Sequence, residues 1–257
     1  MADVHPNCIF HFTKKFDALK GILPGDFNVS YAREKIVGKG RSIQFAVPMV
    51  SFCDIKLSDI QYHIASYGKY GIGMSKEWAV QSGLNPVMYI SKKSDIAVDL
   101  IAEVKRSSSS MGESKDSASR RIAKKSLMHS FNVLRYVKNY QGDNLRADGT
   151  TTRDYRYANE REWRYVPPMN STARPLLSLD DVSTADKKAA WNAKISTLKL
   201  SFEPGDIKYI IIPSDDSSER QLPFLRHGHG DNPQLLSRSW CQHVPACPLV
   251  SAAAREV

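Results

Sequence analysis

Two carboxylates stand two residues apart in the stretch NEREWRYVP, which runs from Asn159 to Pro167. Glu160 and Glu162 are separated by Arg161 and followed by Arg164. The aromatic residues around them favour a strand, on which alternate side chains share one face. Glu160, Glu162 and Arg164 would then point the same way, with the carboxylates about 7 Å apart at a rise of roughly 3.3 Å per residue. The competing interpretation is a half-exposed edge strand with alternating charges.

Such a carboxylate pair suits a displacement at the anomeric carbon of a ribose. One carboxylate can hold the 2′-hydroxyl while positive charge develops on the sugar, and hydrogen bonds to that hydroxyl strengthen in the transition state. The other carboxylate can orient or deprotonate the incoming nucleophile. Two carboxylates repel each other, and burial of both would raise the pKa of one.

Composition bounds the class of protein and its partners. The chain has 257 residues, and its formal net charge is 36 − 27 = +9. That excess favours polyanionic partners such as nucleic acid, and it also suits a phosphate-bearing cofactor. The sequence contains no apolar run long enough for a membrane span and no signal-peptide pattern at its start. Four scattered cysteines favour a reducing cytoplasm over a disulfide framework, and Cys241, His243 and Cys247 match no zinc spacing.

Hydrophobic periodicity predicts an α+β protein in which strands and helices are interspersed. We expect a single domain over residues 1–227 and an irregular tail over residues 228–257. The stretch 96–104 fits either a helix or a strand. The expected strands cover residues 8–13, 43–52, 70–75, 87–90, 157–166, 194–202 and 207–213. The expected helices cover residues 16–23, 57–66, 76–83 and 127–140.

Residues 105–126 differ sharply in composition from the segments around them, being rich in serine, lysine and arginine. They predict a mobile basic loop, with Arg120, Arg121, Lys124 and Lys125 available to contact phosphates of RNA or single-stranded DNA. The alternative is a solvated linker without a role in binding.

Several motifs together carry a resemblance to known families. The opening CIFHFTKKFDALKGIL, with its H-x-T pattern, resembles the start of ADP-ribosyltransferase-like folds, including DarT-type enzymes that modify nucleic acid. The segments AVPMVSFCDIKLSD, YGKYGIGMSKEW, NPVMYI and NEREWRYVP resemble the AbiGi family of bacterial abortive-infection proteins, which are labelled antitoxins of phage-resistance systems. The resemblance covers roughly residues 8–91 and 155–215. It implies two small packed antiparallel or mixed sheets with peripheral helices.

The resemblance also implies an activity, which is mono-ADP-ribosyl transfer from NAD to a nucleic acid without a metal. Glu162 would be the catalytic carboxylate, required for activity and not for folding, and Glu160 would face the acceptor. The residues implied to contact NAD are His11, Phe12, Thr13, Tyr67, Tyr70 and Ser75. Structural alternatives are a core position for His11, strand packing for Tyr70 and a helix cap for Ser75.

Two other functions compete with transfer from NAD. The resemblance to labelled antitoxins implies a non-catalytic protein that binds and neutralises a toxin partner. The stretch DLIAEVKR supplies Asp99, Glu103 and Lys105, which on a strand could hold Mg²⁺ beside a base in a nuclease. Arg33 or Arg41 could hold a pyrophosphate, but no motif fixes either of them there.

Overall fold

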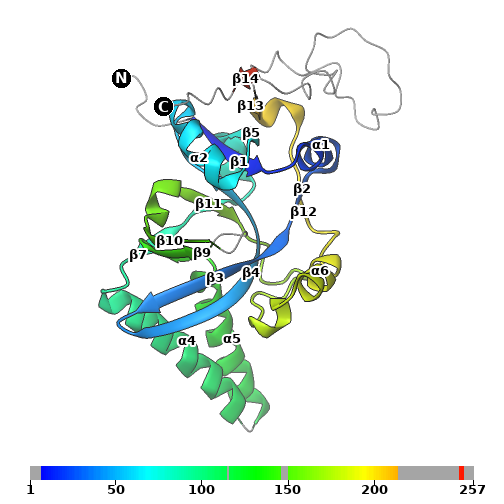
Figure 1. The fold of residues 1–257 in the computed structure, drawn as a ribbon. Coiled ribbons are helices and arrows are strands. Elements are labelled where there is room, and N and C mark those ends of the chain that lie inside the picture. Colours follow the sequence, from blue (N-terminus) through cyan, green and yellow to red (C-terminus); the bar gives the residue numbers. More distant parts are fainter. Residues whose placement is uncertain (1–6, 115, 146–149, 214–248, 252–257) are drawn as a thin grey trace. The chain divides into compact units, whose positions relative to one another are not determined.

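The computed structural model describes residues 7–114, 116–145, 150–213 and 249–251, and it shows a mixed α+β fold (Figure 1). The chain divides into two compact units that are each assembled from separate stretches. Unit 1 comprises Met1–Asn28, Ser51–Leu84 and Lys199–Val257, and unit 2 comprises Val29–Val50 and Asn85–Leu198. The single domain over residues 1–227 stays a prediction, because two compact units can belong to one domain.

Unit 1 contains the strand near the amino terminus and the glycine-spaced strand Tyr70–Ser75. Its elements are β1 (Cys8–Thr13), α1 (Phe16–Gly25), β2 (Phe27–Asn28), η1 (Leu57–Asp59), α2 (Ile60–Tyr67), β5 (Tyr70–Ser75), α3 (Lys76–Gln81), β12 (Lys199–Leu200), η4 (Pro204–Asp206), β13 (Ile207–Ile212) and β14 (Leu249–Ser251). The strand β4 (Arg41–Cys53) ends in this unit. β5 pairs antiparallel with both β1 and β13, and β14 pairs parallel with β13.

β5 is buried along its whole length, and its two glycines make room for rings on the neighbouring strands. Gly73 lies opposite Phe10 of β1, and a Cβ atom there would come within 2.8 Å of the Phe10 ring. The same atom would come within 3.0 Å of Tyr209 on β13. The Tyr70–Ser75 motif therefore packs aromatic side chains over the backbone of a central strand.

Unit 2 is built around a long β-hairpin. Its elements are β3 (Ser30–Gly38), β4 as far as Val50, β6 (Asn85–Pro86), β7 (Met88–Ile90), α4 (Asp95–Glu113), α5 (Ser117–Leu134), β8 (Val137–Asn139), β9 (Gly142–Leu145), β10 (Thr151–Tyr155), η2 (Tyr157–Glu160), β11 (Glu162–Tyr165), η3 (Asp180–Val182) and α6 (Ala185–Ala193). β3 pairs with β4 from Ser30 opposite Met49 to Gly38 opposite Arg41. Lys39 and Gly40 both have positive φ, as a two-residue hairpin turn requires.

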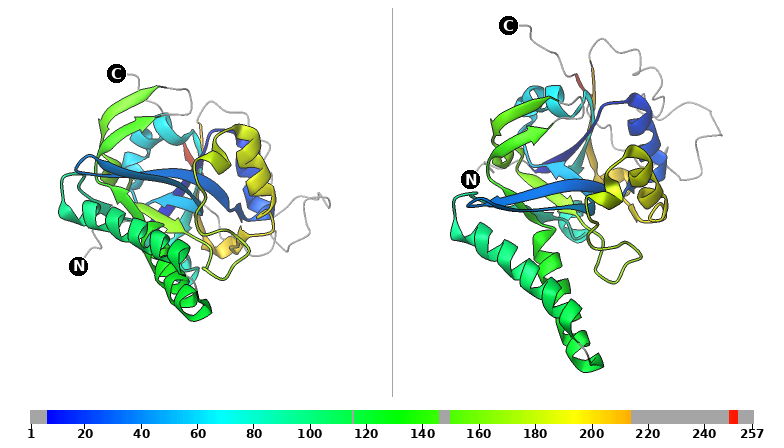
Figure 2. Two further views of the ribbon diagram at one scale, coloured as in Figure 1. Left: turned by 90° about the horizontal axis from the view of Figure 1, so that it is seen from below. Right: turned by 60° about the horizontal axis from the view of Figure 1, so that its bottom comes forward.

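The helices α4 and α5 lie against each other as a helical hairpin, and α4 packs on β3. Figure 2 shows the free end of this hairpin extending away from β3 and β4. The base of α4 buries Ala97, Ile101 and Val104 in the core of unit 2, together with Ile36 and Leu134. Apolar burial thus fixes the base of the hairpin, while the end where α4 stops and α5 starts is polar.

Several sequence predictions are wrong in detail. Residues 105–126, expected as a basic loop, are helical except around the junction of α4 and α5. Asp116 starts α5 by accepting hydrogen bonds from the amides of Ala118 and Ser119. The helix expected over 127–140 ends at Leu134, and β8 follows it. The strand expected over 194–202 shrinks to Lys199–Leu200. Of the predicted irregular tail, only β14 lies within the described residues.

Gly68 occupies a backbone position in unit 1 that a side chain cannot share. Its φ is +125°, and a Cβ atom would lie 2.2 Å from the carbonyl oxygen of Thr13. Gly68→Ala should therefore destabilise the protein by about 1–3 kcal/mol and lower the melting temperature by several degrees. In contrast, Gly21→Ala within α1 meets nothing within 4 Å and should be neutral or stabilising. Equal melting temperatures for the two variants would contradict this backbone geometry.

Candidate functional site

The two carboxylates of the E-x-E motif meet at a single lysine in unit 2. Glu160 ends η2, Arg161 adopts a left-handed conformation with φ 46° and ψ 50°, and Glu162 begins β11. The predicted continuous strand over 157–166 is therefore wrong at its first half. Both carboxylates nevertheless reach Lys138 of β8, whose Nζ lies 2.9 Å from Glu160 Oε2 and 3.0 Å from Glu162 Oε2.

Arg164 is the largest fully buried side chain of the described residues, with no exposed surface. Its Nε donates to Glu162 Oε1 at 2.7 Å, and its Nη2 donates to Glu162 Oε2 at 3.1 Å and to Glu34 Oε1 at 2.5 Å. Its Nη1 donates to the carbonyl oxygen of Arg135 at 2.9 Å. A guanidinium with all three nitrogens engaged can be buried, whereas an unpaired one could not.

These contacts define a charge cluster, which consists of Glu34, Lys138, Glu160, Glu162 and Arg164. Three carboxylates face two cations, and all three glutamates are nearly excluded from water. Burial acts to raise the pKa of Glu162, but Arg164 and Lys138 outweigh it and lower that pKa to about 2. Burial raises the pKa of Glu34 despite the nearby cations. Glu34 therefore accepts a proton more readily than Glu162, which stays ionised.

The backbone around Glu162 is held as firmly as its side chain. The amide of Glu162 donates to the hydroxyl of Tyr89 at 2.9 Å, and its carbonyl oxygen accepts from the amide of Val87 at 2.8 Å. The ring of Tyr157 lies 4.8 Å from Lys138 Nζ and covers the lysine from another side. The cluster thus ties β11 to β7, β8 and β3 within unit 2.

The geometry limits what Glu162 can do chemically. One of its oxygens accepts from Arg164 and the other from both Arg164 and Lys138, so each already has a charged donor. A pKa of about 2 is also far below the near-neutral value that suits a general base. In this arrangement Glu162 acts first as a structural anion, and its catalytic assignment stays a prediction.

The residues predicted to contact NAD lie in unit 1, and three of them have clear structural roles. His11 packs against Phe27 and Phe52, its Nδ1 lies 2.9 Å from the carbonyl oxygen of Ser51, and burial lowers its pKa. Buried Tyr70 packs on the ring of Phe16. Ser75 caps α3 by accepting from the amide of Trp78 at 3.1 Å. These contacts match the structural alternatives that the sequence offers.

The other three residues predicted to contact NAD are Phe12, Thr13 and Tyr67. Thr13 Oγ1 donates to the carbonyl oxygen of Lys15 at 2.9 Å, and the ring of Phe12 lies 6.2 Å from that of Phe10. Tyr67 is half-buried, with its ring 6.2 Å from the ring of His63. All six residues lie in unit 1 and both glutamates lie in unit 2. The NAD assignments therefore stay predictions.

The predicted nucleic-acid and nuclease residues lie on the helical hairpin. Arg120, Arg121, Lys124 and Lys125 are exposed on α5. Asp99, Glu103 and Lys105 lie on α4, so the strand that the nuclease hypothesis needs is not formed, and Glu103 pairs with Arg106 at 2.8 Å. Within the ranges that the structure describes, no group of three metal-ligating side chains comes together, and no helix is long and apolar enough to cross a bilayer.

Two of the five members of the charge cluster could not be predicted from the sequence. Strand alternation correctly placed Arg164 on the face of Glu162, and the structure bears this out. Lys138 and Glu34 gave no signal, because they lie 24 and 128 residues before Glu162 in the chain, on other strands. The sequence also predicts a helix at Lys138, where the structure has the strand β8.

With this geometry in view, comparison with known proteins places the chain among abortive phage resistance proteins. The sequence profile of the family described as "Putative abortive phage resistance protein AbiGi, antitoxin" matches residues 26–213. The chain belongs to this AbiGi family, which confirms that part of the predicted resemblance. A relative named "Abortive phage resistance protein AbiGi", from Lactococcus lactis subsp. cremoris, is 27% identical over 198 residues, covering 71% of this chain and 78% of the relative.

No solved structure matches the fold. The sheets, which contain both antiparallel and parallel strand pairs, and the several helices agree with the predicted α+β class. The finer expectation of an ADP-ribosyltransferase-like arrangement stays a prediction.

Removing the charge of Glu162 should destabilise unit 2. Glu162→Gln keeps the size of the side chain but leaves Arg164 and Lys138 with less compensation in a buried site, which costs about 3–5 kcal/mol. The melting temperature should fall by about 6–20 °C. As a matched control, Glu113→Gln changes an exposed glutamate on α4 and should shift stability by less than about 0.5 kcal/mol. A Glu162→Gln protein that melts with the parent would mean that the cluster is not structural.

The same substitution predicts a change in pH dependence. Because the folded pKa of Glu162 is about 2 and its ordinary value is 4.5, its charge stabilises the fold above pH 4.5 and this contribution is lost as pH falls towards 2. Protonated Glu162 resembles glutamine, so the stability gap between the parent and Glu162→Gln should narrow across that range. Urea midpoints measured from neutral pH downward would show it. A stability difference between the two proteins that stays constant as pH falls would contradict the low folded pKa of Glu162.

Proposed function

We propose that this chain is an antitoxin of a phage-resistance system and acts by binding a toxin protein, without catalysing a reaction of its own. The proposal applies to this chain the word that describes its family, which is antitoxin. In this role the fold supplies a stable surface, and the toxin partner supplies the activity that stops growth of the infected cell.

The proposal rests on one observation, which is that each charged side chain of the charge cluster already pairs with another member of the cluster. A catalytic carboxylate needs an oxygen that can reach a substrate, as well as a pKa suited to its task. Glu162 fails the first condition, because it is buried and both oxygens accept hydrogen bonds from Arg164 or Lys138. The cluster is better suited to fixing strands than to transferring ADP-ribose.

The structural roles in unit 1 support the same conclusion. The packing of the half-buried ring of His11 against Phe27 and Phe52, the packing of Tyr70 and the capping contact of Ser75 each account for the residue without a cofactor. A transferase that uses NAD remains the competing function. It predicts toxicity of the chain alone and binding of NAD.

Growth of cells tests the proposal directly. Expression of this chain alone should leave growth unchanged, and coexpression with the toxin from the same phage-resistance locus should restore growth that the toxin alone abolishes. The two proteins should also copurify. Gly68→Ala provides a negative control, because a variant with a destabilised unit 1 should protect less well.

Binding of NAD separates the two functions. If NAD bound the folded chain, it would stabilise it by about 2.7 kcal/mol at a hundredfold excess over the dissociation constant. We expect no shift in melting temperature with millimolar NAD. Growth arrest by this chain alone, together with stabilisation by NAD, would overturn the antitoxin proposal in favour of the transferase.

A further inference from the structure

The outer face of α5 carries a band of four cations, Arg120, Arg121, Lys124 and Lys125, which we call the basic band. All four side chains are exposed. Among the residues that the structure describes, none of the four forms an ion pair or a side-chain hydrogen bond. The acid that precedes them, Asp116, is occupied in capping α5 through the amides of Ala118 and Ser119. The positive charge of the band is therefore not compensated locally.

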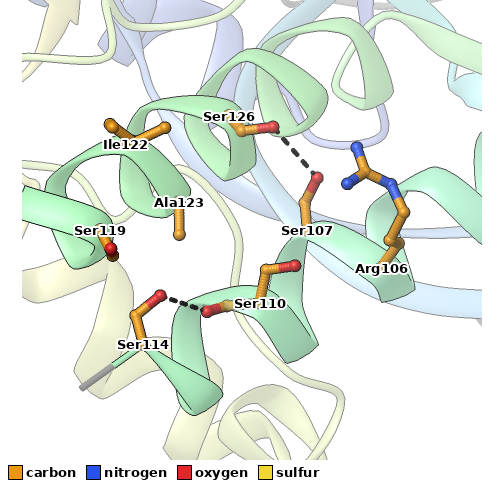
Figure 3. A pocket seen from close by; sticks show the side chains of 8 residues that line it. All are labelled: Arg106, Ser107, Ser110, Ser114, Ser119, Ile122, Ala123 and Ser126. Atoms are coloured by element: carbon orange, nitrogen blue, oxygen red, sulfur yellow. Dashed lines mark hydrogen bonds between the residues drawn. The ribbon is translucent and has the colours of Figure 1, made fainter. Parts of the chain in front are cut away.

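The basic band points away from the partner helix α4. At 100° per residue, its four positions cover one side of α5. The opposite side contains Ser119, Ile122, Ala123 and Ser126, which together with residues of α4 line the pocket between the helices (Figure 3). In that interface, Ser107 Oγ lies 3.4 Å from Ser126 Oγ. Small residues thus hold the two helices together, and the basic band is left to face solvent.

The spacing of the cations resembles the charge spacing of a nucleic-acid duplex. The six residues 120–125 occupy about 9 Å of the helix axis at about 1.5 Å per residue, or about one positive charge per 2.3 Å. A DNA duplex carries about one negative charge per 1.7 Å of its axis, and a single strand has about half that density. The duplex is thus the closer match in charge density.

The surroundings of the band favour a polyanion over a protein surface. The exposed large apolar residues of α5, Ile122 and Val133, lie at helical positions on the side of the pocket and not within the band. Protein interfaces are built around buried aromatic and apolar anchors, and lysine and serine are depleted there. Backbone recognition of nucleic acid uses arginine, lysine and hydroxyl groups without such anchors.

We propose that the basic band on α5 binds the phosphate backbone of duplex nucleic acid without reading its base sequence. This function is separate from the proposed antitoxin role and does not depend on it. It differs from the expectation of RNA or single-stranded DNA as the acceptor, because the proposed ligand is a duplex and the band offers contacts to phosphates alone.

Fluorescence anisotropy with labelled duplexes tests the proposal on the full chain. The variant Arg120→Gln/Arg121→Gln/Lys124→Gln/Lys125→Gln keeps helix-forming side chains and changes the net charge from +9 to +5, since four positive charges are removed. The matched control is Lys35→Gln/Lys93→Gln/Arg41→Gln/Arg153→Gln, which removes two lysines and two arginines that are exposed elsewhere in unit 2. Both variants should fold, as circular dichroism would show.

The salt dependence of binding gives the quantitative result. Four lost phosphate contacts should reduce the slope of log affinity against log salt by about 3.6, because each contact contributes about 0.9. Between about 50 and 200 mM salt, the parent should therefore lose about 150-fold more affinity than the basic-band variant. The control should keep a slope close to that of the parent.

Several outcomes would overturn the proposal. Equal slopes for the two variants would mean that net charge, and not the band, drives binding. Tighter binding of single strands than of duplexes would exclude duplex recognition. Competition by polyglutamate as strong as that by unlabelled duplex would assign the band to an acidic protein partner. Duplex DNA and duplex RNA should bind alike, since both present the same phosphates.

Discussion

The buried guanidinium of Arg164 is the constraint around which unit 2 is organised. Removing a guanidinium from water costs several kcal/mol, and attraction to carboxylates offsets this only when the geometry is good. Here two glutamates and a backbone carbonyl surround it, from β3, β11 and the end of α5. Each of these groups must be in place before the others are satisfied. The cluster therefore demands one arrangement of strands and disfavours alternatives in which any member is moved.

That demand explains why the chemistry suggested by the sequence is not what the geometry favours. Two glutamates in an E-x-E motif look like a catalytic pair when only the local sequence is considered. In the folded unit, Lys138 bridges them and Arg164 engages one of them on both oxygens. Glu160 and Glu162 thus hold the strands of unit 2 together. An antitoxin that acts by binding, as proposed for this chain, can retain such a cluster for the stability of its scaffold.

The sequence predicted those elements whose pattern is local. The strand Cys8–Thr13, the glycine-spaced strand Tyr70–Ser75 and the cap at Ser75 follow from periodicity and turn chemistry, and the structure has them. It failed where tertiary contacts override composition. The serine-rich stretch looked too polar to order, yet α4 and α5 pack through small side chains and a capping aspartate. Arg161 turns left-handed and breaks a predicted strand, which no pattern in the sequence foretells.

The division of the chain into interleaved stretches has a consequence for its synthesis. Unit 1 begins within the first residues, but its strand β13 starts at Ile207, after all of unit 2 has been made. At about 5–20 residues per second, β5 waits roughly 7 to 26 seconds on the ribosome for this neighbour. During that interval the edge of β5 that later pairs with β13 has no partner strand, and an unpaired strand edge can pair with another chain. The order in which the ribosome delivers these strands is thus part of what the cell must manage to obtain the folded protein.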